Sequence, residues 1–167
     1  WAAAVDGIRT TDTRPKGRSC RVELETGPVT LTGIAKGSGM IRPDMATMLA
    51  YIATDADIDQ PLLRKLLRDA VAVSFNRISV DGDTSTNDAC ALIATGASGS
   101  RLSAEVDIRR FADALDALCI ELAREIVADG EGATRELAVR VTGAGSVAEA
   151  ERVAFTVAES PLVKTAL

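Results

Sequence analysis

The chain has 167 residues and is 47% hydrophobic, a size and composition that predict one domain with a buried core. Nineteen basic and 24 acidic residues give a net charge of −5, which argues against a nucleic-acid-binding surface, and no apolar run reaches the roughly 20 residues of a membrane span. Because histidine is absent, Ser-His-Asp and Cys-His catalysis and HExxH zinc sites are excluded.

The first half of the chain predicts a β-hairpin, a buried strand and a helix, in that order. Residues 21–25 (RVELE) and 29–35 (VTLTGIA) alternate polar and apolar side chains around a Gly-Pro turn, which is typical of a hairpin. The continuous apolar run at 48–54 (MLAYIAT) predicts a strand buried on both faces. Asp59 is a candidate N-cap for the helix that follows. Its apolar residues recur at helical spacing: Leu62, Leu63, Leu66, Leu67, Ala70 and Val71.

The middle of the chain predicts two short strands and the longest helix. The strands are expected at 78–80 and 89–95, on either side of the polar loop 81–88 (DGDTSTND). An apolar stripe with charges on the opposite face predicts a helix over 104–128. The stripe consists of Ile108, Phe111, Leu115, Leu118, Leu122 and Ile126.

The last part of the chain predicts a strand, a capped helix and a final strand. Residues 137–141 alternate like a strand, and 163–167 look like another. Ser146 and Glu149 have the spacing of a capping box for a helix that ends near Ala158. Together, the elements predict a single mixed α/β domain of α+β type, with helices packed on a sheet.

Several familiar motifs fail on inspection. The glycine loop 37–42 (GSGMIR) has Arg42 where a dinucleotide-binding fingerprint needs a third glycine, and no Gly-Lys-Ser/Thr occurs. The loop 81–88 begins like a calcium loop, but Thr86 stands in place of the glycine and Leu92 in place of the bidentate glutamate. We therefore expect neither a nucleotide site of these kinds nor a metal site.

The cysteines and the first residue bear on the setting of the chain. Cys20, Cys90 and Cys119 are isolated and lack CxxC spacing, so we expect buried thiols in a reducing compartment, without disulfide or zinc. The chain begins at Trp1, and its first residues lack the n-region and h-region of a signal peptide. We expect that it begins inside a longer protein.

One nucleophile chemistry works without histidine, and Thr47 is placed for it. If the Ala46–Thr47 bond is cut, the new α-amine, with a pKa of roughly 8, can act as the base for the hydroxyl of Thr47. A glycine-rich loop and Pro43 precede this bond, and an apolar strand follows it. The alternative is that Thr47 merely opens a strand and that KGSG is an ordinary loop.

Five segments, in this order along the chain, resemble one family: TTDTRPK (10–16), KGSGMI-x-P-x-MATML (36–49), FNRISVDGDTSTND (75–88), DGEGAT (129–134) and SPLVKTAL (160–167). They resemble the ornithine acetyltransferase family, also called bifunctional glutamate N-acetyltransferase/amino-acid acetyltransferase. Members of that family are much longer, so the resemblance implies that this chain is a middle segment of the complete protein.

The resemblance implies a layered helix–sheet–sheet–helix sandwich, of the kind shared with self-processing aminopeptidases and incomplete in this chain. It also implies self-cleavage at the Ala46–Thr47 bond. The segment 1–46 would then be the end of an α-chain, and 47–167 the start of a β-chain.

The resemblance further implies that Thr47 takes acetyl from N-acetylornithine and passes it to glutamate in a ping-pong cycle of arginine biosynthesis. No cofactor is implied, although acetyl-CoA would serve as a donor in a bifunctional member. The family's substrate contacts fall on Thr10, Lys36, Thr47 and Glu131. Lys36 would pair with a substrate carboxylate and Glu131 with a cationic group. On pattern alone, both are solvated loop charges, and Thr10 caps a turn.

The implied setting is a cytoplasmic heterotetramer of two α and two β chains that binds small molecules. The family's oxyanion donors would precede Trp1, and further ligand-binding residues would follow Leu167, so we expect residues 1–167 alone to be inactive. Two alternatives remain: a self-processing amidohydrolase or aminopeptidase that gives the acyl group to water, and an uncleaved, non-catalytic relative. We assign no chemical step to the loop 81–88, because a tight turn packed near the nucleophile strand is enough to explain its sequence.

Overall fold

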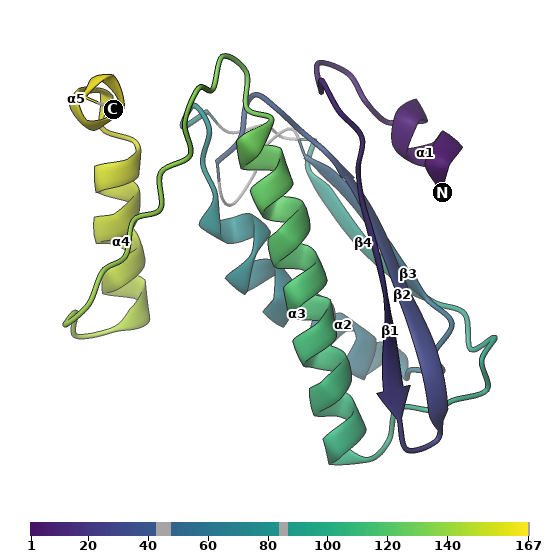
Figure 1. The fold of residues 1–167 in the computed structure, drawn as a ribbon. Helices are drawn as coiled ribbons and strands as arrows, with labels where there is room; N and C mark the ends of the chain where they lie inside the picture. The colour runs from purple at the N-terminus through teal and green to yellow at the C-terminus, as the bar shows by residue number, and fades with distance from the viewer. Residues whose placement is uncertain (43–47, 84–86, 167) are drawn as a thin grey trace.

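A four-stranded mixed sheet forms the centre of the computed structural model, which describes residues 1–42, 48–83 and 87–166 (Figure 1). The strands lie in the order β1-β2-β3-β4, which is also their order along the chain. The first three pair antiparallel, and β4 runs parallel to β3. Their bounds are β1 (Lys16–Leu24), β2 (Gly27–Lys36), β3 (Leu49–Thr54) and β4 (Ala89–Ala94).

The predicted hairpin is confirmed, and its first strand, β1, begins at Lys16, before the predicted stretch 21–25. Leu24 pairs with Gly27, so the turn consists of residues 25–26, and the predicted position at Gly27-Pro28 is wrong because both residues belong to β2. Val22 pairs with Val29, and both side chains are buried. Alternation thus places one row of apolar side chains on the face that the helices cover.

Two helices, α2 (Gln60–Val73) and α3 (Glu105–Ala128), cover one face of the sheet (Figure 1). Both were predicted, and Asp59 occupies the N-cap position of α2, although its side chain makes no capping bond. The apolar stripe of α3 faces inward, and Phe111, Leu115 and Leu122 are fully buried. A short helix, α1 (Ala2–Gly7), which the sequence did not predict, lies near β2 on the other side of the sheet.

The predicted α4 (Val147–Ala158) is confirmed together with its cap. The hydroxyl of Ser146 accepts a hydrogen bond from the Glu149 N–H at 3.2 Å, and the Glu149 carboxylate accepts one from the Gly145 N–H at 2.6 Å. Within the described part of the chain, no helix is long and apolar enough to cross a bilayer.

Three predicted strands are wrong. Residues 78–80 follow a 3₁₀ turn, η1 (Phe75–Arg77), and are irregular, as are residues 137–141. The expected strand at 163–167 is replaced by the helix α5 (Pro161–Thr165), with its proline in the first turn. Alternation is insufficient for a strand, because a strand needs a neighbouring backbone to accept and donate its hydrogen bonds.

The predicted α/β class is confirmed, since helices pack against a mixed sheet within one core. The parallel β3–β4 pair is joined by α2, as such a crossover requires. The register places Lys36, Leu49 and Ala89 side by side at one end of the sheet. The described segments that carry Thr10, Lys36 and Glu131 converge there.

Candidate functional site

The candidate site lies where β2 ends and where β3 and β4 begin. Because Lys36 pairs with Leu49 and Leu49 with Ala89, the segments that flank these residues are neighbours. The predicted nucleophile Thr47 and its partner Ala46 lie outside the described residues. Met48 is the first described residue after them, and its side chain is buried.

Thr10 and Lys36 are brought into contact across 26 positions of sequence. The ammonium of Lys36 donates a hydrogen bond to the Thr10 hydroxyl at 3.2 Å. Lys36 is only 6% exposed, whereas Thr10 is exposed, so the two form a hydroxyl–ammonium pair at the edge of solvent. A mostly buried ammonium retains little water, which makes it a strong partner for a carboxylate. The alternative of a solvated loop charge therefore does not describe Lys36.

Glu131 lies against the same glycine-rich loop. Its backbone N–H donates to the carbonyl of Ser38 at 2.8 Å. Its carboxylate packs on Gly39, where an added Cβ would lie 2.9 Å from the Glu131 Cδ. The hydroxyls of Ser38 and Thr11 are also hydrogen-bonded, at 2.7 Å. The three described residues predicted to contact substrate thus lie in or against residues 36–39: Lys36 begins this stretch, Thr10 contacts Lys36, and Glu131 contacts the residues that follow.

A buried ionic network beneath this loop was missed by the sequence analysis. The ammonium of Lys16 contacts Asp12 Oδ1 at 2.6 Å and Asp129 Oδ2 at 2.5 Å, and the Lys16 side chain is 0% exposed. Asp12 also accepts the N–H of Gly37 at 2.7 Å and that of Thr10 at 3.3 Å. The network therefore joins the segments that contain Thr10 and Gly37 to the end of α3.

The charges of this network stabilise one another. Burial by itself would raise the pKa of Asp12, but hydrogen bonds from the Lys16 ammonium and the Gly37 N–H outweigh it, so this pKa lies below its ordinary value. For Asp129, burial is likewise outweighed by hydrogen bonds from Lys16 and Thr13, and its pKa is also lowered. Asp12, Lys16 and Asp129 all lie in the family-like segments 10–16 and 129–134. Their place in these segments was the only sign in the sequence that they belong to the site.

The loop 81–88 contacts the backbone on both sides of residues 43–47. The carboxylate of Asp81 accepts the N–H groups of Met40 at 2.6 Å and Ile41 at 3.0 Å. Asp88 accepts the N–H of Met48 at 2.7 Å. Within the loop, the Asp83 N–H donates to Asp81 at 3.1 Å, which is the tight Asx turn predicted from the sequence.

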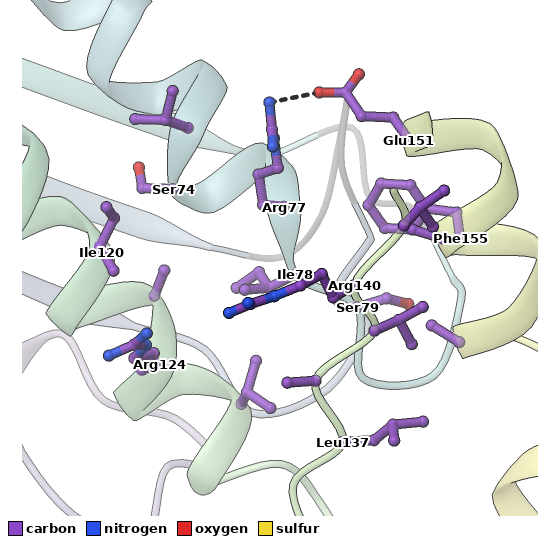
Figure 2. Close-up of a pocket in the computed structure, with 18 of the residues that line it drawn as sticks. Ser74, Arg77, Ile78, Ser79, Ile120, Arg124, Leu137, Arg140, Glu151 and Phe155 are labelled. Carbon is purple, nitrogen blue, oxygen red and sulfur yellow. Dashed lines mark ion pairs between the residues drawn. The ribbon is translucent and has the colours of Figure 1, made fainter. Parts of the chain in front are cut away.

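A cavity of about 620 Å³ lies elsewhere, between α2, α3, α4 and residues 136–141 (Figure 2). It is lined by apolar groups and by three arginines, of which Arg77 pairs with Glu151 at 2.7 Å. None of the described residues predicted to bind substrate lines it. In the described ranges, no group of three or more His, Cys, Asp and Glu side chains is placed to hold a metal ion.

Comparison with known proteins gives close relatives over the whole chain. The profile of the ArgJ family matches residues 2–167. The "arginine biosynthesis bifunctional protein ArgJ" of Pseudomonas fluorescens (strain Pf0-1) is 50% identical over 171 residues, and that of Chlorobaculum tepidum is 53% identical over 167 residues. Each alignment covers 100% of this chain, but only 42% and 41% of those relatives. The chain therefore spans about two fifths of their length.

A solved structure is also similar. It is the crystal structure of the arginine biosynthesis bifunctional protein argJ from Bacillus halodurans, with a TM-score of 0.62 and 45% sequence identity. The superposition covers 66% of this chain and 53% of that one.

Proposed function

Because the chain belongs to the ArgJ family, as its motifs predicted, we propose that it carries the acyl-transfer part of an arginine-biosynthesis enzyme. In this proposal, acetyl moves from N-acetylornithine to glutamate through an ester on Thr47. The observation that carries it is the arrangement of Thr10, Lys36 and Glu131 around the loop 36–39, directly before the Thr47 segment.

Self-cleavage prepares the nucleophile in two steps. The hydroxyl oxygen of Thr47 attacks the carbonyl carbon of Ala46, and the C–N bond breaks as the amide nitrogen takes the proton that the hydroxyl loses. Water then hydrolyses the ester, which leaves a carboxylate on Ala46 and a free α-amine on Thr47. This amine is tethered a few bonds from its own hydroxyl, so little orientational entropy is lost in using it as a base.

The transfer reaction uses the same groups. The α-amine accepts the hydroxyl proton as the oxygen attacks the acetyl carbon of N-acetylornithine, and it returns that proton to the departing ornithine nitrogen. The amine of glutamate then attacks the acetyl ester and restores the hydroxyl. Lys36 binds the α-carboxylate of either substrate, and Glu131 receives the cationic group of the ornithine half.

The proposal is tested in the full-length protein with Thr47→Ala. The unchanged protein should appear as two chains by intact mass, the second beginning at Thr47, and should form N-acetylglutamate. The Thr47→Ala protein should remain a single chain without transfer, whereas Thr47→Ser should still be cut. A single intact chain that transfers acetyl would contradict the proposal.

The same assay separates the competing functions. If acetate forms at equal rates with and without glutamate, the enzyme is an amidohydrolase. If neither product forms and the chain stays whole, it is a non-catalytic relative. We also propose that the mature enzyme is a cytoplasmic assembly of two α and two β chains, and that residues 1–167 alone are inactive.

The role of Glu131 has its own test. Glu131→Gln removes the negative charge that binds the ornithine ammonium, so the KM for N-acetylornithine should rise by about tenfold. The KM for glutamate, whose side chain ends in a carboxylate and not in an ammonium, should not rise. Glu136→Gln, an exposed residue five positions on, is the matched control and should leave both constants unchanged. Equal effects of Glu131→Gln on both substrates would contradict this assignment.

A further inference from the structure

The loop 81–88 holds the chain that leads into residues 43–47. One carboxylate, that of Asp81, accepts two consecutive backbone N–H groups, from Met40 at 2.6 Å and Ile41 at 3.0 Å. The Val80 N–H donates back to the carbonyl of Ile41 at 2.8 Å. Ile41 is therefore bound through both its N–H and its C=O, and its side chain is 1% exposed.

The far end of the same loop holds the chain that leaves residues 43–47. Asp88 accepts the N–H of Met48 at 2.7 Å. The Ala89 N–H donates to the carbonyl of Met48 at 3.1 Å. Met48 is thus also bound through both its N–H and its C=O. Ile41 and Met48, on the two sides of the predicted cleavage segment, are therefore both hydrogen-bonded to the loop 81–88 and the residues next to it.

Asp88 makes its contact at a cost to the fold. Burial raises the pKa of Asp88, and the Met48 N–H and the charge of Lys36 offset this only in part. A raised carboxyl pKa means that the ionised form is less favourable in the folded protein than in water, so above that pKa Asp88 lowers stability.

We propose that Asp88 is a positioning residue for acyl transfer at residue 47, and that Asp81 anchors the opposite flank of the same segment. Met48 nitrogen is covalently bound to the carbonyl carbon of residue 47, and the peptide group is planar. Orienting the Met48 N–H therefore orients the peptide unit that joins the nucleophile to β3. The inference rests on the proposed role of Thr47, and it gives the motif 81–88 a part in the reaction.

The test compares Asp88→Ala, Asp88→Asn and the control Asp83→Ala in the full-length protein. Misplacement of a reacting group by about 1 Å costs on the order of 10²-fold in rate. Asp88→Ala should therefore slow self-cleavage and kcat by about 10²-fold, while the KM for N-acetylornithine stays within about twofold. Asp88→Asn keeps the shape and one acceptor oxygen, so it should recover to within about tenfold of the unchanged rate. Asp83→Ala, in the same loop and exposed, should behave like the unchanged protein.

The outcomes separate this inference from the proposed function. If the unchanged protein is processed and Thr47→Ala blocks processing, but Asp88→Ala matches the unchanged protein, only the inference on Asp88 is overturned. A raised KM with unchanged kcat would also overturn it, because it would make Asp88 a substrate-binding residue. If the unchanged protein is neither cut nor active, both fail. Should Asp88→Ala not fold, the fall in kcat at constant KM in Asp88→Asn decides the matter.

Discussion

Lys16 differs from the surface lysines in how much its charge contributes to the stability of the fold. Its side chain is 0% exposed and lies between two carboxylates, whereas in the Lys65–Asp69 pair the side chains are 69% and 55% exposed. An exposed ion pair gives up contacts with water for a weak attraction, so its net contribution to stability is small. Removing one member of a buried network leaves the remaining charges without water or partner.

We expect Lys16→Met to lower the free energy of unfolding by about 3–5 kcal/mol, because Asp12 and Asp129 would then repel each other in a buried site. Lys65→Met is the matched control, and its effect should stay within about 0.5 kcal/mol. Urea denaturation of both variants measures the difference. Equal effects of the two substitutions would show that the buried network does not stabilise the fold.

At the scale of elements, helix and sheet approach each other closely where α3 crosses β2. Gly33 lies there, and an added Cβ would lie 2.7 Å from Leu118 Cδ2 and 3.1 Å from Leu122 Cδ1. The helix can pack this closely only because β2 carries no side chain at that point. The burial of Leu118 and Leu122 at this crossing depends on this contact.

Gly33→Ala should therefore destabilise the protein by about 1–3 kcal/mol, since the added methyl group forces the leucines of α3 outward. At Gly7, the last residue of α1, an added Cβ meets nothing within 4 Å. Gly7→Ala should leave stability unchanged or raise it by up to about 1 kcal/mol. Thermal melts monitored by circular dichroism compare the two, and a neutral Gly33→Ala would contradict this account of the packing.

At the scale of the whole molecule, the site is assembled from four distant segments. Residues 10–16, 36–41, 81–88 and 129–131 meet at one end of the sheet, and the Lys16–Asp129 contact spans 113 positions. The ionic network thus couples the geometry of the site to global folding. Its protonation should accordingly appear in the stability of the entire chain.

The pKa values of Asp12 and Asp129 are lowered from 3.8, so their stabilising contribution is complete well above that pH and is lost as the pH falls below it. We expect the free energy of unfolding to decrease from about pH 4 toward pH 2, and to decrease less steeply in Asp129→Asn. Glu23→Gln, from the exposed Arg21–Glu23 pair, should leave the slope unchanged. Asp88 and Asp116, whose pKa values are raised by burial, act in the opposite direction, but they are common to all three proteins. Urea midpoints across this range provide the measurement, and parallel curves for the unchanged protein and Asp129→Asn would refute the prediction.

The sequence by itself determined the elements whose signals are local. The hairpin follows from its period of two, although its turn lies at residues 25–26 and not at the predicted Gly-Pro. The helix α3 follows from its period of 3.6 and α4 from the Ser146 cap, because each pattern is contained within a few neighbouring residues. Motif resemblance likewise determined the family and nominated Thr10, Lys36 and Glu131.

Only the tertiary structure decided which segments find a partner. Residues 137–141 alternate as well as the hairpin strands do, yet they form no strand, because pairing depends on a second backbone that lies elsewhere in the chain. The Lys16 network and the two-sided hold of Asp81 and Asp88 were hidden for the same reason. Ion pairs and carboxylate–amide bonds act over about 3 Å in space, and no local pattern records which distant residues the fold will bring that close.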